Sequence, residues 1–337
     1  MQQVYQFFRL IRFSNILVIV LTMSLFYGLL SNYNTQRQYL LSDFNGADEI
    51  LNPSFYETIG FADFNFILLI LSVVLIASSG NIINDYFDQK ADRVNKPERI
   101  IIDKYIKRRW AIILNWTFNG IGFLIALYLT YTLHNWWIVI ISFLSINLLY
   151  FYSAIYKRKF LSGNIIVAFL TALVPLYVFV YGAFSNFNSD SPFGNNDEVV
   201  VFDNLLAVVV YCGFAFLLNL IREIIKDIAD VKGDLMLKSK TFPIRYGFKK
   251  TKYFLTVLYV LALIPLLYFI VKQLLLTTTV QTNALLTFIY LLIGVVIFVV
   301  LSLVILINFN QRKYYLSASN MLKIAMFLGV ISALFYS

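Results

Sequence analysis

The sequence contains a single cysteine and a single histidine among its 337 residues. One cysteine excludes a disulfide framework and a cysteine-based metal cluster. One histidine excludes a site built from several histidines, zinc sites of that kind included. Charged residues are also scarce: they make up 13% of the chain, against roughly 25% in soluble proteins. The six prolines are scattered and low-complexity segments are absent, which argues against fibrous and disordered classes.

What the sequence has in abundance is apolar side chains. They make up 60% of the chain, against roughly 45–50% in soluble globular proteins. A soluble protein of this composition could not cover its surface with polar groups, so the solvent must be lipid. The net charge of +9 would also suit a nucleic-acid partner, and the positions of the charges decide between the two.

Charge-free intervals predict nine spanning helices, because a span needs about 20 mostly apolar residues. The interval Trp110–Tyr156 would be about 70 Å long as one helix, so we expect two spans that turn at His134–Trp137. The ninth span is the shortest and has Lys323 near its start. The expected spans and intervals are 13–36, 64–84, two within 110–156, 160–189, 204–221, 253–271, one between the polar turn 277–283 and residue 311, and 320–336.

The basic residues predict the orientation of these spans. With the N-terminus in the cytoplasm, all but three of the 27 basic residues fall in cytoplasmic segments. Arg37 and Lys272 lie outside, and Lys323 is expected at the inner mouth of the last span. This positive-inside pattern predicts a multi-pass protein of the inner (cytoplasmic) membrane with its C-terminus outside, and no nucleic-acid partner. The first span is interpreted as a retained helix, because no small-residue cleavage site follows it.

The eighteen acidic residues divide equally between the two sides of the membrane. The outer nine, Asp63 among them, show no pattern and are interpreted as solvated charge. The inner nine lie in two long segments, and each segment carries three aspartates at offsets 0, +3 and +7. These aspartates are Asp85, Asp88 and Asp92 after the second span, and Asp227, Asp230 and Asp234 after the sixth.

Offsets of 0, +3 and +7 place three side chains on one narrow face of a helix. Like charges so placed repel one another, and Mg²⁺ would compensate, since it takes one or two carboxylates, water and substrate phosphate oxygens. Two such faces opposite each other predict a diphosphate site. Basic side chains near both faces suit the remaining anionic oxygens; they are Arg93, Lys96, Arg99, Lys157, Arg222 and Lys226. Asn81 and Asn84 are expected to line a chamber, because amides are costly against lipid.

These residues resemble the motifs of the UbiA superfamily of intramembrane prenyltransferases, from about Leu10 to the last spans. The matching stretches are Asn81-x-x-Asn84-Asp85-x-x-Asp88-x-x-x-Asp92 with Arg93-x-Asn95-Lys96-Pro97-x-Arg99, the second acidic motif with Lys240-Thr241-x-Pro243-Ile244-x-x-Gly247, Tyr152-Ser153 with Lys157 and Gly163-Asn164, and Arg12-x-x-Asn15. The second motif is most similar to the branch that makes digeranylgeranylglyceryl phosphate, an ether lipid.

The resemblance implies an all-α, polytopic membrane protein: a single domain over 1–337, with nine helices around a central chamber and with 85–109 and 222–252 as cytosolic cap loops. It also implies Mg²⁺-dependent transfer of a polyprenyl group from prenyl diphosphate to a lipophilic acceptor within the lipid bilayer. The six aspartates would be catalytic and metal-binding, and Asn15 would bind substrate. Tyr152 is the best candidate for an aromatic face beside an allylic cation.

Several alternatives stay open. Phe13 and the stretch 100–104 depart from the family pattern, so the acceptor could be geranylgeranylglyceryl phosphate or an aromatic quinone precursor such as 1,4-dihydroxy-2-naphthoate. The proton acceptor could be Asp230, Glu223 or the leaving diphosphate. A rival from another class is a polytopic transporter of a phosphorylated solute, with the same aspartates as a gate.

Overall fold

The structure is a computed structural model in which nearly all of the described residues are helical. It describes residues 2–45, 63–95, 100–185, 198–236, 238–276 and 290–332. The helices are α1 (Gln2–Leu10), α2 (Phe13–Asn45), α4 (Phe64–Asn95), α5 (Arg108–Leu133), α6 (Trp136–Ala154), the short η2 (Tyr156–Arg158), α7 (Ser162–Phe184), α8 (Glu198–Met236), α9 (Phe242–Leu276), the π-helical η4 (Leu291–Val296), α11 (Ile297–Asn308) and α12 (Arg312–Ile331). Within these ranges the β-structure is one isolated bridge between Ile102 and Ile106. The all-α prediction is confirmed.

Eight helices in the described ranges are long and apolar enough to cross a membrane, so this is a multi-pass membrane protein. They lie in α2, α4, α5, α6, α7, α8, α9 and α12. The span expected before residue 311 corresponds to a shorter apolar helix, Ile293–Asn308, whose length of about 24 Å falls short of the ~30 Å hydrocarbon core. The predicted count of nine is therefore not confirmed.

The expected turn between the third and fourth spans is present. His134 ends α5 in the left-handed conformation, and the Asn135 side chain caps α6 by accepting from the Trp137 amide at 3.1 Å. The Asn135 amide also donates to the Val180 carbonyl at 2.9 Å, which ties the corner to α7. Trp136 is 73% exposed, as expected for a side chain at the membrane interface.

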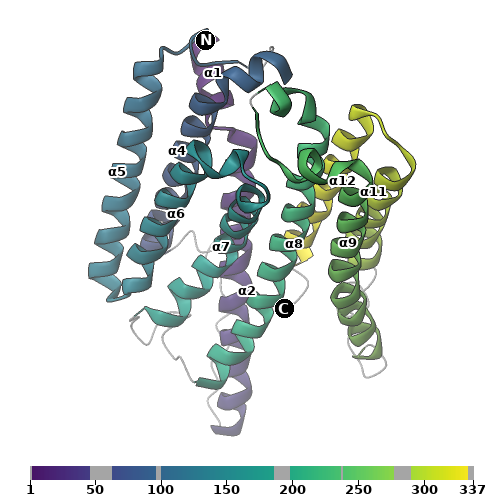
Figure 1. Cartoon of the computed structure of the whole chain (residues 1–337). Helices are drawn as coiled ribbons and strands as arrows, with labels where there is room; N and C mark the ends of the chain where they lie inside the picture. The colour runs from purple at the N-terminus through teal and green to yellow at the C-terminus, as the bar shows by residue number, and fades with distance from the viewer. Residues whose placement is uncertain are drawn as a thin grey trace.

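The helices form one bundle in which α8 is central. It contacts α4 and α7 on one side and α9 and α12 on the other (Figure 1). A large hydrophobic core occupies the end of the bundle where α4 begins, with Phe66, Leu129, Ile138 and Tyr181 fully or almost fully buried. This core closes that end. The opposite end, where α4 and α8 finish, is called the motif end below, and the N-terminus lies there too.

Two expectations about single charges need correction. The last helix begins at Arg312 rather than near Asn320, so Lys323 lies well inside it and not at its mouth. Asp63 is not simply solvated. Its Oδ1 accepts from the Asn65 and Phe66 amides and so caps the start of α4, and its Oδ2 accepts from the Tyr181 hydroxyl at 2.6 Å. Interpretation as surface charge failed because the partner comes from a distant helix.

Candidate active site

Both acidic motifs lie on helices that continue past the apolar spans. The segments predicted as loops begin as helix: α4 runs on to Asn95 and α8 to Met236. Each aspartate triplet is therefore helical throughout. The offsets of 0, +3 and +7 then place Asp85, Asp88 and Asp92 on one face, and Asp227, Asp230 and Asp234 on another.

The first motif is held by side chains from two other segments. Arg12, at the junction of α1 and α2, pairs with Asp85 at 2.7 Å. Lys157, in η2, pairs with Asp88 and donates to Asn84 Oδ1 at 2.9 Å. Asp85 and Asp88 thus each face a cation that is far away in the sequence.

Asn81 connects the first motif to the start of the chain. Its amide donates to the Ile11 carbonyl at 2.9 Å, next to Arg12. The bond joins α4 to the α1–α2 junction, which holds Arg12 in place. Within that junction Arg12 adopts a left-handed backbone with φ of 55°.

The second motif is held in the same way. Asp227 accepts from the Asn164 amide, at the start of α7, at 2.7 Å. Asp230 pairs with Arg312, the first residue of α12, at 3.1 Å, and the Arg312 Nε also donates to the Ala229 carbonyl. Asp234 lies close enough to Asp227 for their charges to interact.

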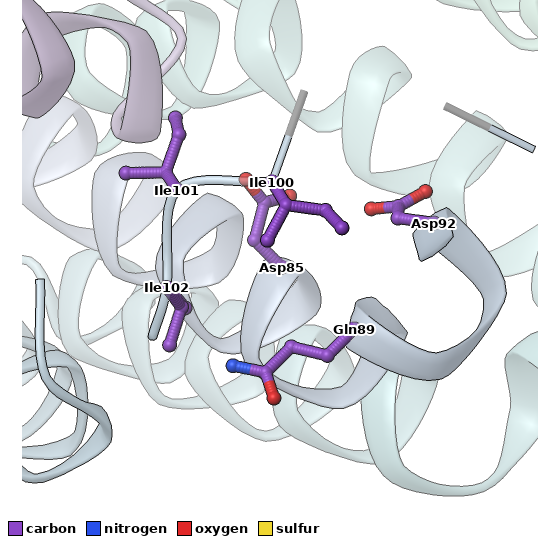
Figure 2. A pocket seen from close by; sticks show the side chains of 6 residues that line it. All are labelled: Asp85, Gln89, Asp92, Ile100, Ile101 and Ile102. Atoms are coloured by element: carbon purple, nitrogen blue, oxygen red, sulfur yellow. The ribbon is translucent and has the colours of Figure 1, made fainter. Parts of the chain in front are cut away.

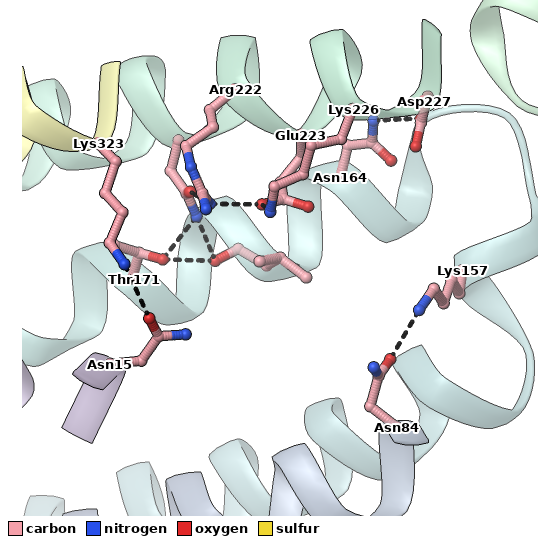
Figure 3. Close-up of polar contacts among 12 residues, drawn as sticks. Asn15, Asn84, Lys157, Asn164, Thr171, Arg222, Glu223, Lys226, Asp227 and Lys323 are labelled. Atoms are coloured by element: carbon pink, nitrogen blue, oxygen red, sulfur yellow. Dashed lines mark hydrogen bonds and ion pairs between the residues drawn. The ribbon is translucent and has the colours of Figure 1, made fainter. Parts of the chain in front are cut away.

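Lys157 stands between the two motifs. It bonds to Asn84 and Asp88 of α4, and its charge also acts on Glu223 and Asp227 of α8. Figure 3 shows it reaching toward Asn84 across the space that Asp227 borders from the other side. Desolvation lowers the pKa of Lys157, but its partners, led by Asp88, outweigh this and leave the pKa raised, so the amine is charged. Because 33% of the side-chain surface stays accessible, it lies on the wall of an open space.

Tyr152 lies beside this lysine, near the end of α6. Its ring centroid is 5.7 Å from the Lys157 Nζ. The charges of Asp88 and Asp227 both act on Tyr152, so the ring lies between the two motifs. Tyr152 and Lys157 therefore both lie within reach of charges on α4 and on α8.

The other residues that were expected to bind anions or substrate lie in several different environments. Arg222 and Lys226 both pair with Glu223 on the same helix, with Arg222 at 2.9 Å. Arg93 is exposed at the end of α4. Asn15 accepts from Lys323 at 3.3 Å rather than facing the aspartates. Lys96 and Arg99 fall outside the described residues.

A small pocket beside the first motif joins it to the segment that follows. Figure 2 shows Asp85 and Asp92 on its rim with Gln89 below, opposite the backbone segment Ile100–Ile102. The Gln89 Oε1 accepts a hydrogen bond from the Arg108 Nε at 2.9 Å. Arg108 is the first residue of α5, so this bond attaches Gln89 of α4 to the start of α5. The segment after the first motif therefore packs against its acidic face.

Four site residues were absent from the sequence-based list: Arg12, Asn164, Arg312 and Lys323. The first two stood inside stretches that resembled the family, so that resemblance was a usable signal. A charged residue inside a spanning helix is itself a functional signal, and this rule would have identified Lys323. Arg312 carried no signal, because its partner Asp230 is 82 positions away.

The donor set suits Mg²⁺. Within the described residues, no three acidic, histidine or cysteine side chains surround a common point, so the protein alone offers no closed cage. Mg²⁺ does not need one, since one or two carboxylates, water and substrate phosphates complete its shell. The oxygens on the two faces are all hard carboxylate or amide donors. The side chains that could hold the ion are those of the two aspartate triplets.

Comparison with known proteins agrees with this site. The model of the UbiA prenyltransferase family matches residues 54–331. Digeranylgeranylglyceryl phosphate synthase of Methanobrevibacter smithii is 35% identical over 214 residues, which is 61% of this chain and 68% of the relative. A solved structure described as giving insights into digeranylgeranylglyceryl phosphate synthase in membranes is 25% identical, with 99% of both chains covered and a TM-score of 0.59.

A more distant neighbour shares the fold alone. It is a UbiA homologue from Archaeoglobus fulgidus bound to DMAPP and Mg²⁺, 14% identical, with 97% of this chain and 99% of that chain covered and a TM-score of 0.53. The family match covers most of this chain and includes both acidic motifs. The chain therefore belongs to the UbiA prenyltransferase family.

Proposed function

We propose that this prenyltransferase moves a polyprenyl group, in a Mg²⁺-dependent reaction, from prenyl diphosphate to a lipid alcohol of the geranylgeranylglyceryl phosphate type. The observation that carries the proposal is the pair of acidic helix faces with Lys157 between them. The similarity to proteins named digeranylgeranylglyceryl phosphate synthase supports this acceptor class over an aromatic one. Membership of a prenyltransferase family argues against the transporter alternative.

The donor diphosphate would bind at the motif end between α4 and α8. The aspartates of both faces would hold Mg²⁺, which stabilises the negative charge on the leaving diphosphate. Arg12 and Lys157 already lie against Asp85 and Asp88 and are charged donors for the remaining diphosphate oxygens. Desolvation lowers the pKa of Arg12, but the charge of Asp85 outweighs it and the pKa is raised, so this donor keeps its proton.

In the reaction, the allylic C–O bond of the donor breaks and its electron pair leaves with the diphosphate. The acceptor oxygen forms the new bond to the allylic carbon and passes its proton to a base, for which Asp230, Glu223 and the leaving diphosphate are the candidates. Tyr152 places an aromatic face next to Lys157 and so next to the breaking bond, where it would stabilise the allylic cation by about 0.5–2 kcal/mol. The buried core at the far end of the bundle keeps water from entering on that side.

The segments 85–109 and 222–252 would cover this site. The Lys240 amide donates to the Arg158 carbonyl at 2.9 Å, which attaches the segment after α8 to η2. Phe242 stacks on Phe160 with ring centroids 5.0 Å apart and reinforces that contact. We also propose that the motif end faces the cytoplasm and the protein lies in the inner membrane, because the basic residues gather there.

A transfer assay tests the function. Purified protein is incubated with radiolabelled geranylgeranyl diphosphate, Mg²⁺ and a panel of acceptors headed by geranylgeranylglyceryl phosphate and 1,4-dihydroxy-2-naphthoate. We expect an ether-linked product with the glyceryl phosphate, and a fall of about 100-fold or more in kcat for Asp85→Asn and for Asp227→Asn, because each removes charge that holds the metal.

Asp103→Asn is the matched control. Its carboxylate is 44% exposed and pairs with Arg108 on the segment beyond the motif, so activity should stay near that of the wild type. Product with the naphthoate alone would reject the acceptor class and keep the prenyl transfer. Neither covalent product nor released diphosphate with any acceptor would reject the enzyme.

A further inference from the structure

We propose that Lys323, Arg222 and Asn15 form a second anion site, distinct from the acidic faces, that takes the phosphate group of the acceptor lipid. The inference rests on the proposed function, because a phosphate-bearing acceptor brings a second anion into the same chamber as the donor diphosphate. It names the part of the bundle that recognises this anion.

Lys323 is a charged side chain inside a spanning helix. It lies about 16 Å along α12 from Arg312, the residue that pairs with Asp230 at the motif end. Side chains on a helix lean toward its N-terminus, so the amine of Lys323 points back toward the motif end. There it donates to the Asn15 Oδ1, near the start of α2, at 3.3 Å. Among the described ion pairs, none joins Lys323 to a carboxylate.

Arg222 supplies the second positive charge. Its guanidinium donates to Glu223 at 2.9 Å and to Asn219 at 3.4 Å, while its Nε is buried without a hydrogen-bond partner in the described residues. Glu223 is shared, because Lys226 pairs with it as well. Arg222 and Lys323 are close enough for their like charges to act on each other. Positive charge therefore exceeds negative charge here, and an anion between the two would compensate.

This cluster differs chemically from the two acidic faces. An anion at the aspartates needs a metal ion to bridge like charges, whereas an anion at Lys323 and Arg222 meets cationic donors directly. A phosphomonoester fits such a site, because a guanidinium binds phosphate with two parallel hydrogen bonds and an ammonium adds a point charge. The Asn15 amide lies beside the Lys323 amine and can donate to a phosphate oxygen.

The positions of the two sites also suit the reaction. In Figure 3, Lys323 and Asn15 lie on one side of the open space and Lys157 and Asn84 on the other, with Arg222 nearer the former pair. Two anionic substrates are thus kept apart, which avoids repulsion between their charged groups. The acceptor hydroxyl is on the same glycerol as the phosphate, so it can reach into the space between the sites.

Steady-state kinetics on the full-length protein in lipid nanodiscs tests the site. Lys323→Met removes the charge but keeps the length of the side chain, and Lys323→Arg restores the charge. Lys313→Met, an exposed lysine on the same helix, is the control. Each variant is assayed with geranylgeranylglyceryl phosphate and with geranylgeranylglycerol, which lacks the phosphate, while the donor KM is measured in parallel.

For Lys323→Met we expect the KM for the phosphate-bearing acceptor to rise about tenfold or more, which is the loss typical of one charge-assisted hydrogen bond. The donor KM should be unchanged, which also reports an intact fold. Lys323→Arg should recover most of the loss, and Lys313→Met should match the wild type. With geranylgeranylglycerol, wild type and Lys323→Met should have the same KM, because the phosphate that Lys323 contacts is missing.

Other outcomes overturn the inference and are distinguishable from a failure of the proposed function. If the wild type makes the ether product and Lys323→Met keeps its acceptor KM, the second site is wrong while the function stands. A rise in the donor KM, or an equal loss with both acceptors, would assign Lys323 to the donor site or to the fold. If the wild type prenylates neither glyceryl acceptor, the proposed function fails and the inference fails with it.

Discussion

At the scale of single residues, Lys157 organises the candidate site. It lies in the short η2 helix between two spans, yet it bonds to α4 and acts on charges of α8. Sequence reasoning identified it as one of six possible anion-binding cations. Its central position could not be predicted, because it depends on which helices are neighbours in space.

Removing the Lys157 charge should therefore weaken donor binding and transfer. For Lys157→Met we expect kcat/KM for prenyl diphosphate to fall about 100-fold, since a preorganised donor to the leaving group is lost. Lys157→Arg should regain part of the rate. Lys159→Met is the control two residues away, because Lys159 is exposed and its amine lies over the Tyr156 ring, 4.8 Å from the centroid. Equal kinetics for the methionine variants at 157 and 159 would contradict this role.

At the scale of elements, the spans and the helical acidic faces were predictable, whereas the partners that hold those faces were not. Long apolar runs between charges define the start of α4 and the bounds of α5, α6 and α7 within a few residues, because burial in lipid dominates their stability. From their offsets, the acidic stretches were each interpreted as one face of a continuing helix, although a like-charged helix face is unfavourable alone. They remain helical because Arg12, Lys157 and Arg312 neutralise them from other elements. Charge compensation between distant segments is what a single sequence does not reveal.

A glycine at the start of α7 controls the placement of η2. A Cβ built on Gly163 would lie 2.9 Å from both the Lys157 Cα and the Tyr156 carbonyl oxygen, which are backbone atoms that cannot rotate away. We expect Gly163→Ala to displace η2, to destabilise the protein by about 1–3 kcal/mol and to raise the donor KM. Thermal unfolding in nanodiscs and donor kinetics measure both effects.

Gly120→Ala is the matched control for this change. A Cβ there meets no atom within 4 Å, and the position lies inside α5. Its stability should be equal or up to about 1 kcal/mol higher, because alanine favours helix over glycine. A Gly163→Ala protein with wild-type unfolding temperature and wild-type kinetics would show that the close contact is easily relieved.

At the scale of the whole molecule, the distribution of basic residues along the sequence agrees with the positions of the helix ends in the bundle. The starts of α5, α9 and α12, which are rich in basic residues that the positive-inside rule assigns to the cytoplasm, lie at the end of the bundle that carries the acidic motifs (Figure 1). The far end is closed by the apolar core around Phe66 and Tyr181. The motif end is thus suited to binding phosphate groups, and the opposite end is suited to keeping water out of the bundle.

The proposed orientation can be measured with single cysteines. In a Cys212→Ala background, Lys159→Cys marks the motif end and His134→Cys the opposite end; both native side chains are exposed. A membrane-impermeant maleimide added to cells whose inner membrane is accessible from the outer face should label position 134 and not 159. Permeabilisation should expose 159 as well. Labelling of 159 in sealed cells would place the motif end outside.

α12 contacts two helices of the candidate site, α8 and α2. α12 reaches α8 through Arg312 and Asp230, and it reaches α2 through Lys323 and Asn15. Because α12 follows α8 in the chain, ribosomal synthesis produces both aspartate triplets before it produces Arg312 and Lys323. A nascent chain stalled before α12 would therefore lack the contacts that this helix makes with α2 and α8.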